Sequence, residues 1–69
     1  MNVITLSLAA RGATINNDRP HNSLYRVTFH DGAALCFPVL AGGSFVLVGN
    51  GLPVVIDIDD DVPIGVTPL

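Results

Sequence analysis

The alternation of apolar and polar residues along this chain predicts strands rather than helices. Successive side chains of a strand point to opposite faces, so an apolar residue at every second position indicates one buried face. Five segments follow this pattern, and we expect them to be strands: residues 2–9, 24–30, 33–40, 44–48 and 53–58. The chain is rich in Val, Ile, Thr and Phe and has no Lys or Glu, the residues that commonly cover helix surfaces.

An Asp-Gly pair at residues 31–32 predicts a tight turn between the second and third strands. A two-residue loop would place Leu35 and Phe37 on the polar face of the hairpin. A three-residue loop instead pairs Phe37 with Tyr25 and Leu35 with Val27. Because a shift of one residue moves every side chain to the other face, we expect the three-residue loop, with its glycine in the left-handed region.

An Asn-Gly pair at residues 50–51 predicts a second hairpin, which would join the fourth and fifth strands. A two-residue turn there pairs Phe45 with Ile56 and Leu47 with Val54, so that apolar side chains stay together. We therefore expect these two strands to be neighbours in one sheet.

Three other segments limit how the sheet is built. Pro38 has no N–H group to donate, so we expect the third strand to lie at an edge or to bend there. Residues 10–22 form a polar stretch that we expect to be a long loop, and long ordered loops often carry function. The tail, residues 62–69, is apolar but interrupted by prolines, which predicts an extended edge segment.

These features together predict one all-β domain that covers residues 1–69. The expected architecture is a small five-stranded barrel or curled antiparallel sheet, SH3-like or OB-like, with a short apolar C-terminal tail.

The composition indicates a domain that needs partners. A chain of 69 residues buries only about 60% of its unfolded surface, and its single cysteine excludes an internal disulfide. Hydrophobic residues make up 49% of the chain and charged residues 13%, against roughly 25% charged in an ordinary soluble domain. So few charges leave apolar surface uncovered, which favours self-association or a larger protein assembly.

Charge and hydropathy argue against two other classes of partner. The net charge is −3, whereas binding to nucleic acid requires a basic surface. No run reaches the roughly 18 apolar residues of a membrane span. The apolar start of the chain has no basic residue before it, so we do not expect a secretory signal, and a cytoplasmic or virion location fits better than secretion.

The acidic run at residues 57–61 matches the first ligand positions of a calcium-binding EF-hand loop but departs from that motif where it is specific. Val62 stands where the loop needs a glycine, and Pro68 stands where it needs a glutamate. We interpret the run as solvated charge that protects a sheet edge, with a weak cation site as the alternative.

The sequence contains no pattern of catalytic residues, so we expect neither an enzyme nor a metal or cofactor. His21, His30 and Cys36 lack the paired spacing of a zinc site. Residues 42–44 and 49–51 are glycine-rich but match neither a nucleophile elbow nor a dinucleotide fingerprint. No basic residue stands next to Cys36 in the sequence to activate its thiol.

We therefore expect a non-enzymatic structural or interaction module that works within a protein assembly. A small virion-associated capsid or tail protein is the concrete form of this hypothesis; the alternative is a monomeric protein-binding or inhibitory domain that uses the polar loop 10–22. All three arginines lie within residues 1–30 and five of the six aspartates within residues 31–69, which would suit head-to-tail contact between copies. The candidate partner-binding residues are polar side chains of the first half and apolar side chains of the tail: Arg11, Asn17, Arg19, His21, Arg26, Val62, Ile64 and Val66.

Overall fold

Seven strands and no helix occur in the part of the chain that the structure describes. The structure is a computed structural model, and it describes residues 2–7, 11–59 and 63–69. No helix long and apolar enough to cross a membrane is found in those ranges. The strands are β1 (Asn2–Ser7), β2 (Gly12–Asn16), β3 (Ser23–Phe29), β4 (Ala34–Val39), β5 (Ser44–Val48), β6 (Pro53–Ile58) and β7 (Gly65–Pro68).

The all-β prediction is confirmed, whereas the expected number of five strands is wrong. Strand β2 lies within residues 10–22, which we expected to be a loop, and the apolar tail contributes β7. As expected, the tail lies at a sheet edge, where it pairs with β2.

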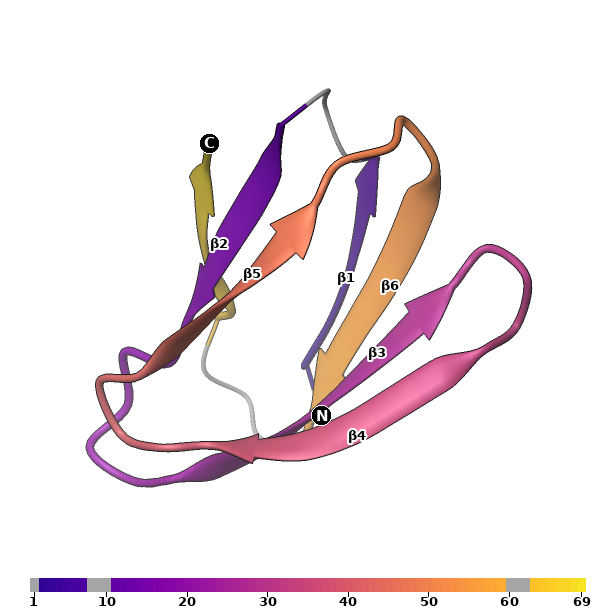
Figure 1. Cartoon of the computed structure of the whole chain (residues 1–69). Helices are drawn as coiled ribbons and strands as arrows, with labels where there is room; N and C mark the ends of the chain where they lie inside the picture. Colours follow the sequence, from indigo (N-terminus) through magenta and orange to yellow (C-terminus); the bar gives the residue numbers. More distant parts are fainter. Residues whose placement is uncertain (1, 8–10, 60–62) are drawn as a thin grey trace.

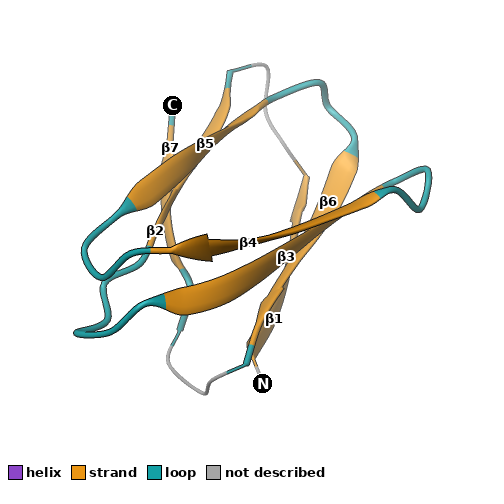
Figure 2. Ribbon diagram, turned by 60° about the horizontal axis from the view of Figure 1, so that its bottom comes forward, coloured by secondary structure: helices purple, strands orange, loops and turns teal. Residues whose placement is uncertain are grey.

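The strands form two antiparallel sheets that face each other (Figure 1). The larger sheet has the strand order β1-β6-β3-β4, and the smaller sheet has the order β5-β2-β7. Apart from the β3–β4 hairpin, every successive pair of strands belongs to different sheets. No pairing joins β4 to β5 or β1 to β7 among the described strands, so the sheets do not close into a barrel (Figure 2).

The core lies between the two sheets and follows the alternation of the sequence. Ile56 of the larger sheet and Ile15 of the smaller sheet are fully excluded from solvent. Burying a side chain of this size contributes about 1.5–3 kcal/mol. The rings of Tyr25 and Phe45 meet edge to face across the core, with centroids 5.6 Å apart. The buried apolar residues are Ala13, Ile15, Tyr25, Val27, Val39, Val54, Ile56, Ile58 and Ile64.

The predicted β3–β4 hairpin is confirmed in register and in turn geometry. Tyr25 is opposite Phe37. The N–H of Phe29 donates to the carbonyl of Ala33 at 2.8 Å, and the N–H of Gly32 donates to the carbonyl of Phe29 at 2.9 Å. Gly32 has a φ of 91°, the left-handed conformation that the three-residue loop requires. The expectation that β4 lies at an edge is also confirmed.

The predicted hairpin between β5 and β6 is wrong. Phe45 of β5 is opposite Ile15 of β2, and Ile56 of β6 is opposite residues of β1 and β3. The segment around Asn50 instead carries the chain from one sheet to the other, with the Leu52 N–H donating to Oδ1 of Asn50 at 2.9 Å. An Asn-Gly pair predicts a local turn, but the strand that pairs with β5 is decided by packing at long range.

Candidate functional site

Two of the polar candidate partner-binding residues, Asn17 and Arg19, are buried. Their exposed fractions are 0% and 3%. Nη1 of Arg19 donates to Oδ1 of Asn17 at 3.1 Å and to the hydroxyl of Tyr25 at 2.6 Å. The guanidinium also lies 5.6 Å from the centroid of the Tyr25 ring, within range of a cation–π contact. These contacts give both side chains a structural role and remove them from the surface available to partners.

Asn17 fastens the segment after β2 to the turn between β4 and β5. Its Nδ2 donates to the carbonyl oxygens of Val39 at 2.9 Å, Leu40 at 3.2 Å and His21 at 3.1 Å. The Asn17 backbone N–H also donates to the carbonyl of Gly43 at 2.8 Å. A buried backbone carbonyl is costly to leave without a donor, so these hydrogen bonds of Asn17 stabilise the contact between the two segments.

The remaining candidate residues do not form one surface. Arg11 and His21 are exposed, but they lie beyond opposite ends of β2. Ile64 is buried in the core, and Val66 is exposed on β7. Arg26 is exposed on the larger sheet, and Val62 lies outside the described residues.

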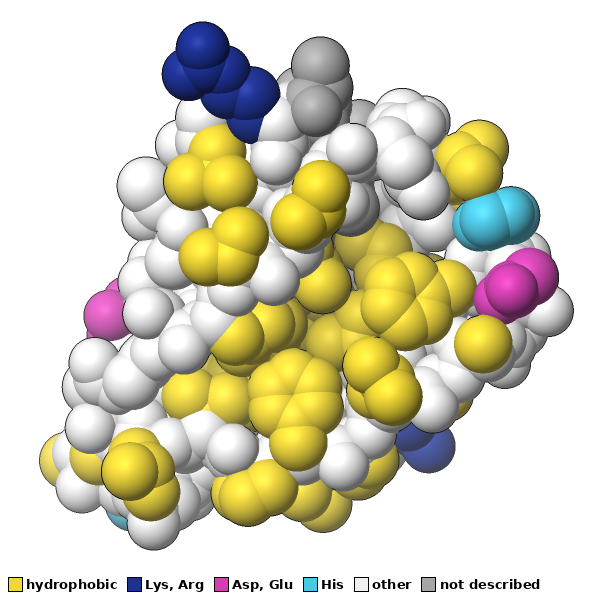
Figure 3. Space-filling view, viewed as in Figure 1, with side chains coloured by type: hydrophobic (Ala, Val, Ile, Leu, Met, Phe, Trp, Pro, Cys, Tyr) yellow, Lys and Arg dark blue, Asp and Glu magenta, His cyan; other side chains and the backbone are white. Residues whose placement is uncertain are grey.

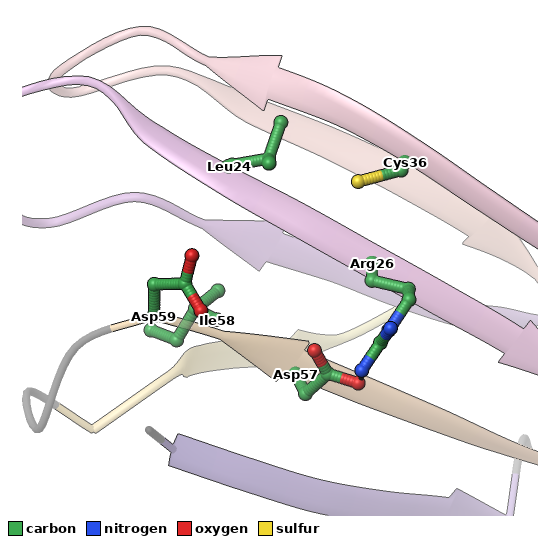
Figure 4. A pocket seen from close by; sticks show the side chains of 6 residues that line it. All are labelled: Leu24, Arg26, Cys36, Asp57, Ile58 and Asp59. Atoms are coloured by element: carbon green, nitrogen blue, oxygen red, sulfur yellow. Dashed lines mark hydrogen bonds and ion pairs between the residues drawn. The ribbon is translucent and has the colours of Figure 1, made fainter.

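A small pocket of about 180 Å³ lies at the strands β3, β4 and β6 (Figure 4). We call it the polar pocket because three of its six lining residues are charged. Nε of Arg26 donates to Oδ2 of Asp57 at 3.0 Å, and this hydrogen bond, followed by the charge of Asp57, raises the pKa of Arg26 above its usual value. Cys36 has no basic neighbour in the sequence, but in the fold it is the cross-strand partner of Arg26 in the β3–β4 pair. The other lining residues are Leu24, Ile58 and Asp59.

The charged side chains of the polar pocket include one ion pair. Arg26 and Asp57 neutralise each other, and the pair is formed within one chain rather than between copies. Among the described residues, no group of three or more His, Cys, Asp or Glu side chains is placed to hold a metal ion. Two aspartates of the acidic run, at positions 60 and 61, lie outside the described residues.

A larger, apolar hollow lies between the edge strands β4 and β5, where the two sheets fail to close (Figure 3). It has two parts, of about 340 Å³ and about 280 Å³, that follow the same gap. None of the residues that line either part is an arginine or an aspartate. We call it the β4–β5 groove and define it by its main apolar residues: Phe29, Leu35, Phe37, Leu40, Phe45, Val46, Leu47, Val48 and Leu52.

Several side chains of the β4–β5 groove are exposed because no strand covers them. Leu35 is opposite Val27 in the register that we expected, but it is 57% exposed rather than buried. Leu40 and Val48 are 66% and 79% exposed. At the inner side of the groove, the rings of Phe37 and Phe45 meet edge to face at 4.9 Å between centroids. The groove therefore has an ordered aromatic floor and an uncovered apolar rim.

No protein-family model, curated protein or solved structure matches this chain. Its function is therefore inferred from the geometry of its own surface. The alternation of the sequence assigned Leu35, Phe45 and Leu47 to the inner faces of the sheets. It did not show that the inner faces are uncovered between the edge strands β4 and β5. The signal that pointed to such a surface was compositional, namely the low content of charged residues.

Proposed function

We propose that this chain is a non-enzymatic interaction module that works within a protein assembly and contacts its partner through the β4–β5 groove. The observation that carries the proposal is the exposed apolar rim of the groove, including Leu35, Leu40 and Val48. Contiguous apolar surface of this kind marks interaction sites in soluble proteins. A small capsid or tail protein of a virion is the concrete form of this proposal.

The energetics of burial support an assembly. Covering apolar surface contributes about 25 cal/mol for each Å² removed from water, so a half-exposed leucine that becomes buried contributes on the order of 1 kcal/mol. The domain itself, at 69 residues, gains limited stability from its own core. A partner that covers the groove would stabilise the folded state by binding it.

The alternative, a monomeric binding or inhibitory domain that uses residues 10–22, has less support. Part of that segment is the central strand β2 of the smaller sheet. Asn17 and Arg19, two of its recognition candidates, are buried. Arg11 and His21 remain exposed, but they lie at opposite ends of the segment.

Sedimentation velocity tests the proposal with two matched leucine variants. Leu35 lies in the groove, whereas Leu24 is similarly exposed but lines the polar pocket on β3. We expect the parent chain to associate as its concentration rises from micromolar to millimolar. Leu35→Ser should weaken that association, and Leu24→Ser should not. A parent chain that stays monomeric throughout, or two variants with equal effects, would contradict the proposal.

A further inference from the structure

Among the strands that the structure describes, β5 has a hydrogen-bonded neighbour, β2, on one side only. The N–H of Gly49 donates to the carbonyl of Arg11 at 3.2 Å, which identifies this pair as a hydrogen-bonded pair of the β2–β5 ladder. Hydrogen-bonded and non-hydrogen-bonded pairs alternate along an antiparallel ladder. Phe45 and Leu47 therefore direct their N–H and C=O groups toward β2.

The three other residues of β5 direct their backbone groups away from β2. These are Ser44, Val46 and Val48, and all three are exposed. No described strand pairs with β5 on that side. β5 thus presents three N–H and three C=O groups beside the apolar β4–β5 groove.

The other sheet edges are less suited to pairing. The same alternation places Pro38 of β4 and Pro68 of β7 at positions whose backbone groups point outward. Because proline has no N–H group, each of these edges lacks a donor at that position. Along β1, two of the three outward-directed positions are Thr5 and Ser7. β5, like β1, contains neither proline nor charge, which are the features that usually prevent strand addition at an edge, but of the two only β5 lies beside the apolar β4–β5 groove.

We propose that β5 pairs antiparallel with β5 of a second copy of this chain, about a two-fold axis at Val46. This inference rests on the proposed function and names the partner. In that register Val46 is opposite the partner's Val46, and Ser44 is opposite the partner's Val48. All of these are outward-directed residues, so the pairing forms six backbone hydrogen bonds and leaves no outward group of β5 without a partner.

The side chains of β5 match the same register. Phe45 is opposite the partner's Leu47 on the inner face, in a non-hydrogen-bonded pair, where cross-strand side chains lie closest. The two copies of Val46 meet on the outer face. No position of β5 carries a charge, so the two-fold arrangement opposes no like charges.

The size of the interface predicts a weak dimer. A standard stable interface buries about 800 Å² on each partner, which is roughly a fifth of the 4108 Å² surface of this chain. A five-residue strand covers less than that by itself, so apolar neighbours such as Leu35 and Leu52 must also be covered. We therefore expect the dimer to form at high micromolar concentration.

Charge substitution at the two-fold axis tests this pairing by sedimentation equilibrium. Val46→Lys and Val46→Asp each place two like charges directly opposite each other, and we expect each to weaken self-association about ten-fold or more. An equimolar mixture of the two variants places Lys opposite Asp and should regain the parent's association. Val3→Lys and Val3→Asp are the controls, because Val3 is an exposed valine of β1, and they should associate like the parent. Far-UV circular dichroism checks that each variant is folded.

Three results would overturn the pairing, and they separate it from the proposed function. If both Val46 variants associate like the parent while Leu35→Ser weakens association, the groove mediates self-association without pairing of β5. If both variants are weakened but their mixture does not recover, β5 contacts a partner in another register or of another sequence. If the parent remains monomeric at every concentration, the pairing and the proposed assembly both fail.

Discussion

The buried amide of Asn17 offers a sharp test of how the two sheets are held together. Asn17→Ala removes the Nδ2 donors to the carbonyls of Val39, Leu40 and His21, and the Oδ1 acceptor for Arg19. Five hydrogen bonds are lost, but the three from Nδ2 share two N–H groups, so we count the five as about four, each contributing about 1 kcal/mol net. We therefore expect a loss of about 3–4 kcal/mol in the free energy of unfolding.

That loss is large for a domain of this size. At about 0.05–0.15 kcal/mol per residue, the whole chain is stable by roughly 3–10 kcal/mol. Asn17→Ala should therefore leave the protein partly unfolded near physiological temperature. Asn16→Ala is the matched control, because the adjacent asparagine makes one exposed hydrogen bond, to Oγ1 of Thr67 at 3.0 Å. We expect it to cost under about 0.5 kcal/mol.

Urea unfolding measures both variants at a concentration below the onset of association. The chain has one tyrosine and no tryptophan, so the fluorescence of Tyr25, which contacts Arg19 in the same cluster, reports on this corner of the fold. The midpoint should fall for Asn17→Ala with an unchanged m value. If Asn17→Ala is no less stable than Asn16→Ala, the amide does not fasten the two segments and the reasoning is refuted.

Three other perturbations have expected outcomes that differ in size. Gly12→Ala should cost more stability in thermal melts than Gly32→Ala. Both glycines have positive φ, but a Cβ at Gly12 would strike the carbonyl oxygen of Leu47 in β5, whereas a Cβ at Gly32 meets open space. Equal costs would contradict the close approach of β2 and β5. Deleting residues 63–69 should unfold the chain or nearly so, because it removes a buried isoleucine and β7; a far-UV circular dichroism spectrum like the parent's would show that β7 is dispensable. Arg26→Gln and Asp57→Asn should lower the melting temperature only slightly, because the Arg26 side chain is 54% exposed and ion pairs open to solvent contribute little. The Asp57 side chain is only 14% exposed, so a large drop for either variant would mean that the pair supports the sheet.

The parts of the fold that follow from the sequence are those in which burial discriminates between alternatives. In the β3–β4 hairpin, one of the two registers would have turned Phe37 to the polar side, so the pattern selected the other. For β5 the pattern could not decide. Pairing with β6 or with β2 keeps Phe45 and Leu47 on the inner face in either case, and the Asn-Gly signal favoured the local partner.

The candidate site was harder to predict because it depends on contacts that are distant in sequence. Asn17 and Arg19 stand in a polar stretch that is typical of a surface loop. Their partners include Tyr25 and the backbone carbonyls at residues 39–40, and no local pattern reveals such contacts. The groove arises in the same way, because alternation assigns Leu35 to the inner face but does not show where the opposing sheet ends.

The uneven distribution of arginine and aspartate suggested head-to-tail contact between copies through charge. In the folded chain, two of the three arginines are not available for such a contact. Arg19 is buried, and Arg26 pairs with Asp57 of its own chain. Arg11 remains exposed. If copies of this chain associate, apolar contact along the β4–β5 groove is the better-supported basis.

Hydrogen exchange along β5, measured residue by residue at two protein concentrations, tests the central claim most directly. In dilute solution the amides of Phe45 and Leu47 should be protected by β2, whereas those of Ser44, Val46 and Val48 should exchange rapidly. At concentrations where the chain associates, the three rapid amides should become protected while the first two change little. Outward amides that are already protected in the dilute monomer, or that remain rapid in the associated state, would contradict the account of β5 as an open edge that a second copy covers.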